Sequence, residues 1–218
     1  MRVNRFILNF IIGLSLLIAD PIKPLSGENL RYVHILFEWE QEVAATAYHL
    51  QASTSSNFNN IILDVEESTT VFIDTENFDW DDTYYWRYRS IYEDGSNGDW
   101  IATENFSIEE SILTDLDVDI NDDSLIQDGV LMYSQFSPYF AVGVIDKYGN
   151  EIWNTQVAYM NYINPYGQLY GVNGRGGEFN FDQQILWETQ EGINIDSHEV
   201  KQIPNGQQLP NGNYMAFV

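Results

Sequence analysis

One histidine near the end of the printed chain lies in a setting that suggests chemistry. His198 falls in the segment Asp196-Ser197-His198-Glu199, ahead of two Pro-Asn-Gly turns and an apolar run, and the chain has only three histidines. A neutral imidazole can act as a nucleophile or carry a proton, and it can donate to an oxygen that gains charge. From spacing alone, a histidine that hydrogen-bonds its own loop is the simpler interpretation.

The other candidate residues carry weaker signals. Arg175 lies in the glycine-rich stretch VNGRGGEF. It could point into a channel at the centre of the fold, although a plain turn explains it more simply. His34 and His49 fall on predicted strands, on the face opposite the apolar residues, so we expect them at the surface.

An acidic stretch, DLDVDINDDS (115–124), has the first spacings of a calcium loop at Asp115, Asp117 and Asp119. Ile120 stands where such a loop needs glycine, and Ile126 stands where it needs glutamate. The alternation of apolar residues therefore favours an acidic edge strand over a metal site.

Composition narrows the function classes. The chain has 218 residues, with 33 acidic and 9 basic ones and a net charge of −24. So acidic a protein argues against nucleic acid and anionic membranes as partners. The 44% hydrophobic and 15% aromatic content predicts a packed core. The absence of cysteine excludes disulfides and thiolate chemistry, and no phosphate-binding loop or paired-histidine zinc motif occurs, so we expect no cofactor and no metal.

Residues 1–20 have the pattern of a signal peptide. Arg2 and Arg5 precede the apolar stretch FILNFIIGLSLLI, and Ala19 is a small residue near a possible cleavage point. A retained membrane anchor is the alternative, but the stretch is short for a span, which needs about 20 residues. We therefore expect a secreted or periplasmic protein that has no membrane association after cleavage.

The segment 21–110 predicts short antiparallel strands. About seven of them fit between residues 28 and 108, with apolar and polar residues in alternation. The residues expected to share an apolar face within each strand are Ile35, Phe37 and Trp39; Tyr48, Leu50 and Ala52; Val71 and Ile73; and Tyr84, Trp86 and Tyr88. The opposite face of the last strand would carry Tyr85, Arg87 and Arg89. This pattern predicts a sandwich of two sheets.

Within that segment, FEWEQEVAATAYHLQAS, TYYWRYRSIYEDGSNGDW and ENFSI resemble a fibronectin type III domain. The resemblance implies that Tyr84 is a corner tyrosine whose hydroxyl returns to the backbone. It also implies a spacer or interaction module, since such domains are seldom catalytic.

The segment 111–218 contains an internal repeat. VIDKYGNEIWNTQ (144–156) and EFNFDQQILWETQ (178–190) both place Asp or Asn seven residues before Trp and end in Thr-Gln, and each precedes a proline–glycine turn and an apolar strand. A period of about 34–45 residues with four short strands predicts β-propeller blades, with two coincidental hairpins as the alternative. Two units are too few to close a propeller, so we expect a fragment of a longer protein.

These units, followed by GINIDSHEVKQIPNGQQLPNGNYMAF, resemble the early blades of bacterial arylsulfate sulfotransferases. The resemblance implies transfer of a sulfuryl group from a phenolic sulfate ester to a phenol through a histidine intermediate, without a nucleotide. His198 would be a supporting pocket histidine, and the nucleophile would lie beyond residue 218. Ser197 replaces the first histidine of the family's pair, and the second Pro-Asn-Gly adds residues before the strand.

The sequence thus predicts an all-β protein, in which a fibronectin III-like β-sandwich (21–110) precedes the first blades of an incomplete β-propeller (111–218). The expected function is the N-terminal part of a secreted aryl-sulfate sulfotransferase that is inactive in this length. The partners would be an aryl sulfate and a phenol. The alternative is a cell-surface binding or adhesion protein built of the same modules.

Overall fold

Strands are the only regular elements in the part of the chain that the structure describes, which confirms an all-β protein. The computed structural model describes residues 20–112, 122, 124–126, 129–135, 141–156, 158–164, 166–193, 195–196, 200–203 and 213–216. Among these residues, no helix is long and apolar enough to cross a membrane. The predicted leader, apart from Asp20, and the calcium-like residues Asp115, Asp117 and Asp119 lie outside the described residues.

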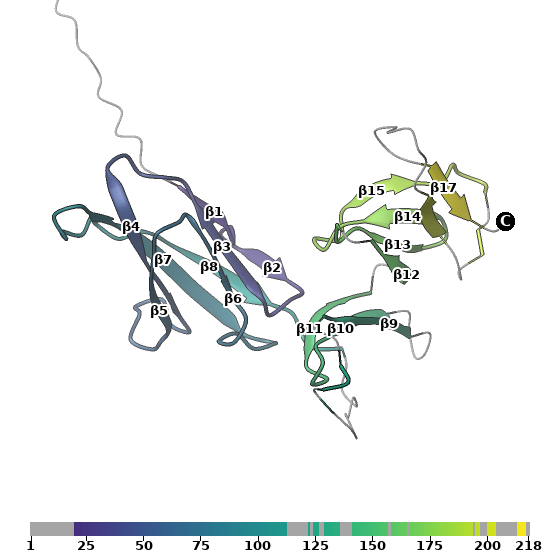
Figure 1. Ribbon diagram of the computed structural model, residues 1–218, viewed down its shortest axis with the longest axis horizontal. Coiled ribbons are helices and arrows are strands. Elements are labelled where there is room, and N and C mark those ends of the chain that lie inside the picture. The colour runs from purple at the N-terminus through teal and green to yellow at the C-terminus, as the bar shows by residue number, and fades with distance from the viewer. Residues whose placement is uncertain are drawn as a thin grey trace, which may run out of the picture.

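The first region, residues 20–112, is built from two sheets that face each other (Figure 1). The smaller sheet has the order β1 (Pro21–Lys23), β3 (Ile35–Trp39), β6 (Val71–Asp74). The larger has the order β2 (Glu28–Leu30), β8 (Ile101–Ile108), β7 (Thr83–Tyr92), β4 (Ala45–Ser53), β5 (Ile61–Glu67). All neighbours are antiparallel except β2 and β8. The strands β2 to β8 correspond to the seven that the sequence predicts.

Alternation along the strands produces one aromatic core between the two sheets. Phe37 and Trp39 of β3 meet Trp86 and Tyr88 of β7, and each of the four is at most 1% exposed. The rings of Trp39 and Tyr88 stack with centroids 5.2 Å apart. Burial of one such side chain contributes about 1.5–3 kcal/mol, so this cluster is the main source of stability in the region.

Val71 and Ile73 share one face of β6, as the alternation predicts, but that face is exposed to solvent, at 42% and 59%. Phe72 packs against the core instead, and Asp74 is buried, where its carboxylate accepts hydrogen bonds from the amides of two following residues. A four-residue strand with apolar residues on both faces does not reveal which face packs inward.

The expectation for Tyr84 is confirmed. Its hydroxyl accepts a hydrogen bond from the Asp79 amide at 2.9 Å and donates to the Asp79 carbonyl at 3.3 Å, while its ring is buried. Burial raises the pKa of Tyr84, so the hydroxyl stays protonated and can make both bonds. The tyrosine therefore pins the loop before β7 to the core.

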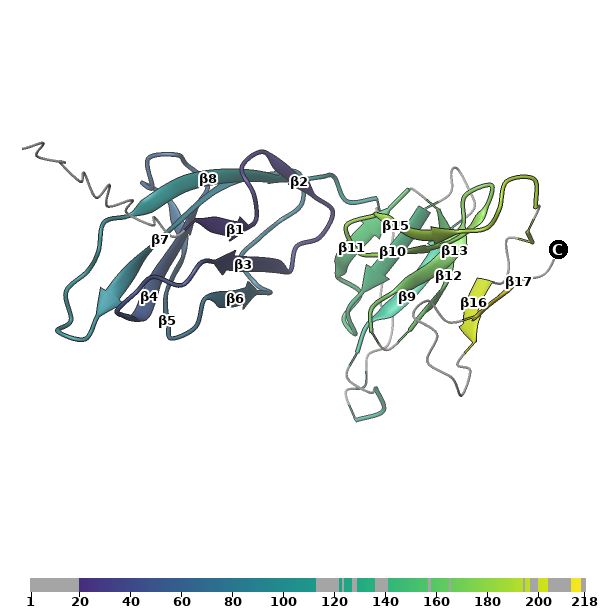
Figure 2. The same cartoon turned by 90° about the horizontal axis from the view of Figure 1, so that it is seen from above.

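The second region consists of smaller sheets (Figure 2). One has the order β11 (Glu151–Thr155), β10 (Ala141–Ile145), β9 (Leu131–Gln135). The next runs in chain order through β12 (Tyr159–Ile163), β13 (Leu169–Val172), β14 (Gly176–Phe179) and β15 (Ile185–Glu188). The last pairs β16 (Val200–Ile203) with β17 (Asn213–Ala216). Within the described residues, none of these sheets closes on itself.

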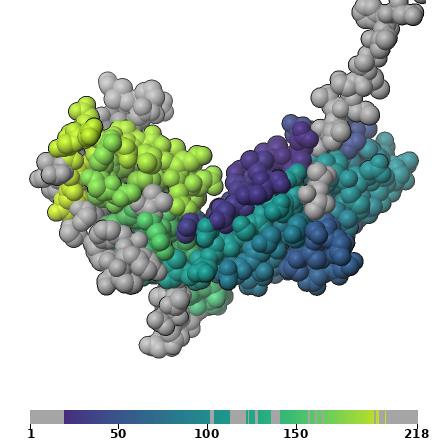
Figure 3. All heavy atoms as spheres, turned by 180° about the vertical axis from the view of Figure 1, so that it is seen from behind, coloured from purple at the N-terminus to yellow at the C-terminus, as the bar shows by residue number. Residues whose placement is uncertain are grey.

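The connection between β2 and β3 joins the two regions by lying along the edge of β11. The Val33 amide donates to the Ile152 carbonyl at 3.1 Å, and the Asn154 amide donates to the Arg31 carbonyl at 3.0 Å. Tyr32 and Trp153 are bridge partners between these bonds. Residues 31–33 therefore act as a fourth antiparallel strand for the sheet β9–β11. The space-filling view shows the two regions meeting at one end of each (Figure 3).

Three hairpins of the second region are built on the same five-residue turn. The turns begin at Asp146, Asn164 and Asn180, whose side-chain oxygens accept the backbone amide four residues later. In each turn the fourth residue has a left-handed backbone: Gly149 (φ 89°), Gly167 (φ 78°) and Gln183 (φ 63°). Asp and Asn favour such turns because their short side chains mimic the backbone. Two of these hairpins belong to the sequence repeat, and the third lies between them.

The first and third of these hairpins are joined through the Trp and Thr of the repeat. The Trp153 indole donates to the Phe181 carbonyl at 3.0 Å, and the Thr155 hydroxyl donates to the Gln183 side chain at 2.9 Å. The rings of Trp153 and Phe181 meet edge to face. The spacing that the two repeat units share thus has a physical role, because the end of the first unit hydrogen-bonds to the turn of the second.

Candidate functional site

His198 lies outside the described residues, together with Ser197 and Glu199. The structure does describe its surroundings in the chain, since β15 ends at Glu188 and β16 begins at Val200. Val200 is fully buried and lies close to Gly176, where an added Cβ would approach the Val200 side chain to 3.0 Å. The first residue of the strand that follows the histidine is therefore packed against the start of β14.

Arg175 performs a structural role at the end of that sheet. Its guanidinium donates to the Thr189 carbonyl through Nε at 2.8 Å and through Nη2, and Nη1 pairs with Glu188 at 3.1 Å. The backbone turns at Gly174, which has a φ of 71°. Arg175 thus ties the β13–β14 turn to the end of β15, as the plain-turn interpretation predicts.

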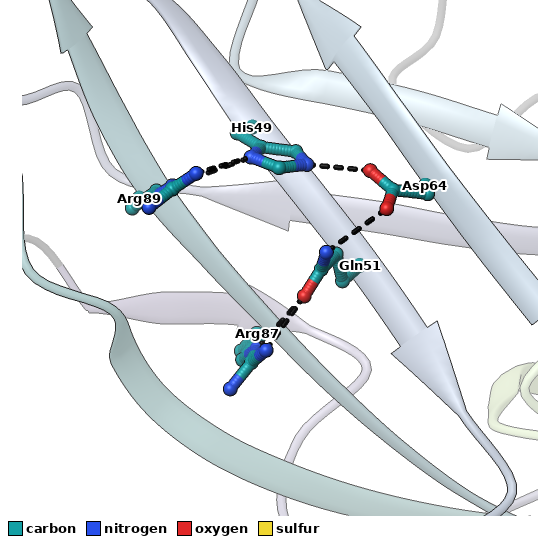
Figure 4. A network of polar contacts seen from close by, with 5 residues as sticks. All are labelled: His49, Gln51, Asp64, Arg87 and Arg89. Carbon is teal, nitrogen blue, oxygen red and sulfur yellow. Dashed lines mark hydrogen bonds and ion pairs between the residues drawn. The ribbon is translucent and has the colours of Figure 1, made fainter. Parts of the chain in front are cut away.

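His49 belongs to a polar network on the outer face of the larger sheet, shown in Figure 4. Its Nε2 lies 2.5 Å from Asp64 Oδ1, and its Nδ1 accepts from Arg89 Nη2 at 2.9 Å. Because the arginine can only donate, Nδ1 must be the acceptor and Nε2 must carry the proton. Gln51 parallels this arrangement by donating to Asp64 at 3.0 Å and accepting from Arg87.

The two arginines also stack on aromatic rings. The Arg87 guanidinium lies 3.9 Å from the centroid of Phe58 and 4.1 Å from that of Trp100, and Arg89 lies 4.4 Å from the same Trp100 ring. Such contacts contribute roughly 0.5–1 kcal/mol each at partly exposed sites. The stack therefore orders the guanidinium groups on an open sheet face.

The contacts in this network keep the Asp64 carboxylate charged beside the two guanidinium groups. Burial alone would raise the pKa of Asp64, but the hydrogen bonds from His49 and Gln51 outweigh it, and the pKa falls below its usual range. Burial lowers the pKa of Arg87, and the neighbouring Arg89 adds to the effect. Asp64 resembles the orienting acid of a catalytic dyad, but the nitrogen that would activate a nucleophile is occupied by Arg89. The network is therefore suited to binding or to stability.

The position of His34 differs from the sequence expectation. It lies in the connection that precedes β3, outside any strand, and lines a pocket where the two regions meet. Within the described residues, no group of three or more histidine, cysteine, aspartate or glutamate side chains could hold a metal ion.

Comparison with known proteins does not assign the chain to a family. It matches no protein-family model, and no curated protein is significantly similar to it.

The sequence does not predict which residues meet in the polar network around His49 or in the pocket at His34. Arg87 and Arg89 were predicted on one outer face, yet nothing in the sequence pairs them with Gln51 and Trp100 across the sheet. The strand registers do, since His49 lies opposite Arg89 and Gln51 opposite Arg87. The pocket at His34 depends on the contact between regions, which no local pattern encodes.

Proposed function

We propose that the chain is the N-terminal part of an exported aryl-sulfate sulfotransferase, with a fibronectin III-like sandwich at 21–110 and propeller blades from 111. The observation that carries the proposal is the interlocking repeat, in which the Trp-x-Thr-Gln strand of the first repeat unit hydrogen-bonds to the turn of the second. A segment that resembles the family's Asp-x-His-His-Asp/Glu pattern, with Ser197 in place of the first histidine of the pair, follows the second copy.

Two further features support blades in the second region. The strands β12 to β15 form a four-stranded antiparallel sheet in chain order, which is the construction of a propeller blade. Thr189 is the counterpart of Thr155 in the repeat, and its hydroxyl is buried without a partner in the described structure. A further hairpin of the same type would supply the acceptor that Gln183 supplies to Thr155.

The proposed chemistry is sulfuryl transfer in two steps. A neutral histidine nitrogen attacks the sulfur of an aryl sulfate, so that an N–S bond forms, the ester S–O bond breaks and a phenolate leaves. The acceptor phenol loses its proton to a base and attacks the same sulfur, which restores the histidine. His198 would donate to a sulfuryl or phenolic oxygen, where charge builds up in the transition state.

The test uses the reading frame that contains codons 1–218 together with the DNA that follows. The complete protein is expected to turn over 4-nitrophenyl sulfate continuously only when a phenol acceptor is present, and without an acceptor it should release about one nitrophenolate per enzyme as the sulfo-histidine forms. Residues 1–218 alone should show no turnover. His198→Asn should lower kcat/KM by about 10²–10³, and His49→Asn, the matched histidine control, should leave it unchanged. If the complete protein folds but transfers no sulfuryl group, the sulfotransferase proposal is wrong.

A cell-surface binding protein is the second candidate, and the ordered Arg87, Arg89 and Trp100 face favours it because stacked guanidinium groups suit recognition. The downstream sequence separates the two candidates. Further repeats that contain histidines and an arginine favour the enzyme, while repeats without them favour binding.

A further inference from the structure

A pocket of about 350 Å³ lies where the connection before β3 meets the second region. Its apolar walls come from Leu36, Trp153 and Phe181, and it reaches Tyr32, His34 and Asp182. The volume lies in the range of natural small-molecule sites, about 300–1,000 Å³. Both regions contribute, so the site exists only in the joined structure.

The apolar walls are fixed before any ligand arrives. Trp153 is 3% exposed, and its indole nitrogen is held by the Phe181 carbonyl. The two rings meet at a centroid distance of 5.4 Å with nearly perpendicular planes. A flat aromatic molecule could lie against this pair without a rearrangement that would weaken binding.

Three polar side chains line the pocket: Tyr32, His34 and Asp182. In the described structure none of them makes a side-chain hydrogen bond or a close ion pair, although the Asp182 carboxylate acts through charge on the Lys23 ammonium and on the Tyr32 hydroxyl. Burial raises the pKa of Tyr32, and the charges of Asp182 and Glu28 add to the effect, so its hydroxyl remains a donor and acceptor near neutral pH. An apolar pocket with a few convergent polar groups is the usual form of a ligand site.

The charges around the pocket select a cation. Among the described residues, the pocket lining contains Asp182 and neither lysine nor arginine. The nearby Lys23 ammonium is bound to Glu28 at 2.6 Å. The net charge of −24 raises the local concentration of cations around the whole protein. We propose that this pocket binds a small aromatic ammonium ion, whose ring packs on Trp153 and Phe181 and whose charged group faces Asp182. The inference is independent of sulfuryl transfer.

The test is a titration of the whole chain with three indoles that differ in charge, in which isothermal calorimetry measures the binding. Tryptamine, the cation, should bind with one site per chain. Neutral 3-methylindole should bind about three- to fivefold more weakly, as expected for loss of a partly exposed charge pair, and the anion indole-3-acetate should bind more weakly still. Equal affinities for all three would overturn the assigned charge, and no saturable tryptamine binding would overturn the site.

Two pairs of variants locate the binding. Asp182→Asn should remove the preference for tryptamine and leave 3-methylindole unchanged, while Asp94→Asn, in an exposed turn of the first region, should change neither. Val130→Trp should fill the pocket and abolish binding, because Val130 lines it and is 56% exposed. Val43→Trp, at a position 87% exposed in the other region, is the matched control. Tryptamine binding that survives Val130→Trp in a folded protein would contradict the location.

Discussion

The two regions of this protein reach stability in different ways. Residues 20–112 enclose a single core between two sheets, with aromatic side chains such as Trp39 and Trp86 almost fully buried. The second region has smaller sheets held by repeated polar turns and by contacts from one hairpin to the next. Its apolar cluster also includes Tyr32 and Val33, which belong to the first region.

The two regions do not depend on each other equally for their sheet partners. The first region already has all its sheet partners without the second. The sheet β9–β11, in contrast, receives its fourth strand from residues 31–33 and a hydrogen bond to the Glu151 carbonyl from the Trp80 indole. The border near residue 110, where the sequence pattern changes, is therefore not the border of the packed cores. The first region works as a structural part of the second and is more than a spacer.

Separating the regions should have the largest effect. Residues 20–112 expressed alone should unfold cooperatively in urea with a native-like near-UV circular dichroism spectrum. Residues 112–218 alone should show neither, because the edge of β11 and the apolar cluster are both left open. A second region that folds alone with a cooperative transition would show that the borrowed strand is dispensable.

The sequence predicts the strands of the first region better than the contacts of the second. Alternation identifies the inward face of β7 and β4, because Trp86 and Leu50 lie in long strands with one polar face. The short strand β6 carries apolar residues on both faces, so the alternation places Val71 and Ile73 together but does not show that their face is the exposed one. Pairing between distant segments, such as residues 31–33 with β11, leaves no periodic signal.

The candidate site was predictable only in part. The repeat located the strands that carry Trp153 and Trp187, but their docking partners follow from three-dimensional packing. Arg175 was correctly expected in a turn, and its bonds to Thr189 required the sheet. His34 was placed on a strand face because the pattern there is regular, whereas β3 begins one residue later.

The next prediction tests the borrowed strand with a single change. Val33→Pro removes the amide that donates to the Ile152 carbonyl, and it should lower the free energy of unfolding of the second region by about 2–3 kcal/mol. Val33→Ala keeps the amide and should cost about 1 kcal/mol, because Val33 is only partly buried. Hydrogen exchange at the Asn154 amide, which donates to Arg31, should accelerate far more in the proline variant. Equal exchange in the two variants would contradict strand addition.

A smaller effect is expected at the interlock between hairpins. Gln183 adopts φ 63°, where the equivalent turns use glycine, so Gln183→Gly should relieve about 1 kcal/mol of backbone strain. The same change removes the acceptor of the Thr155 hydroxyl and should cost about as much, leaving stability nearly unchanged. In a Thr155→Val background that cost is absent, and Gln183→Gly should stabilise by about 1 kcal/mol. Urea unfolding of the four proteins gives the coupling energy, and a value near zero would exclude the interlock.

The smallest effect on the free energy of unfolding is expected at the Asp146 turn, whose first side chain is charged. Burial by itself raises the pKa of Asp146, but hydrogen bonds from Asn150, Tyr148 and Gly149 outweigh it and lower the pKa. A carboxylate with a lowered pKa stabilises the folded state above its unfolded pKa of about 3.9, and this stability is lost as the pH falls through the folded pKa. Asn164 and Asn180 build the same turn without titrating.

Asp146→Asn should therefore convert the first turn into the type of the other two. The Asn150 amide can rotate to accept from the new amide, as Gln168 and Gln184 accept from Asn164 and Asn180. We expect the variant to be less stable than wild type by under about 1 kcal/mol at pH 7, because a charged acceptor is lost. Since the advantage of the carboxylate disappears on protonation, the two free energies of unfolding should converge as the pH falls through the folded pKa of Asp146. Urea titrations at a series of pH values from 7 downward measure this, and a difference that does not shrink with falling pH would mean that the turn depends on shape and owes nothing to its charge.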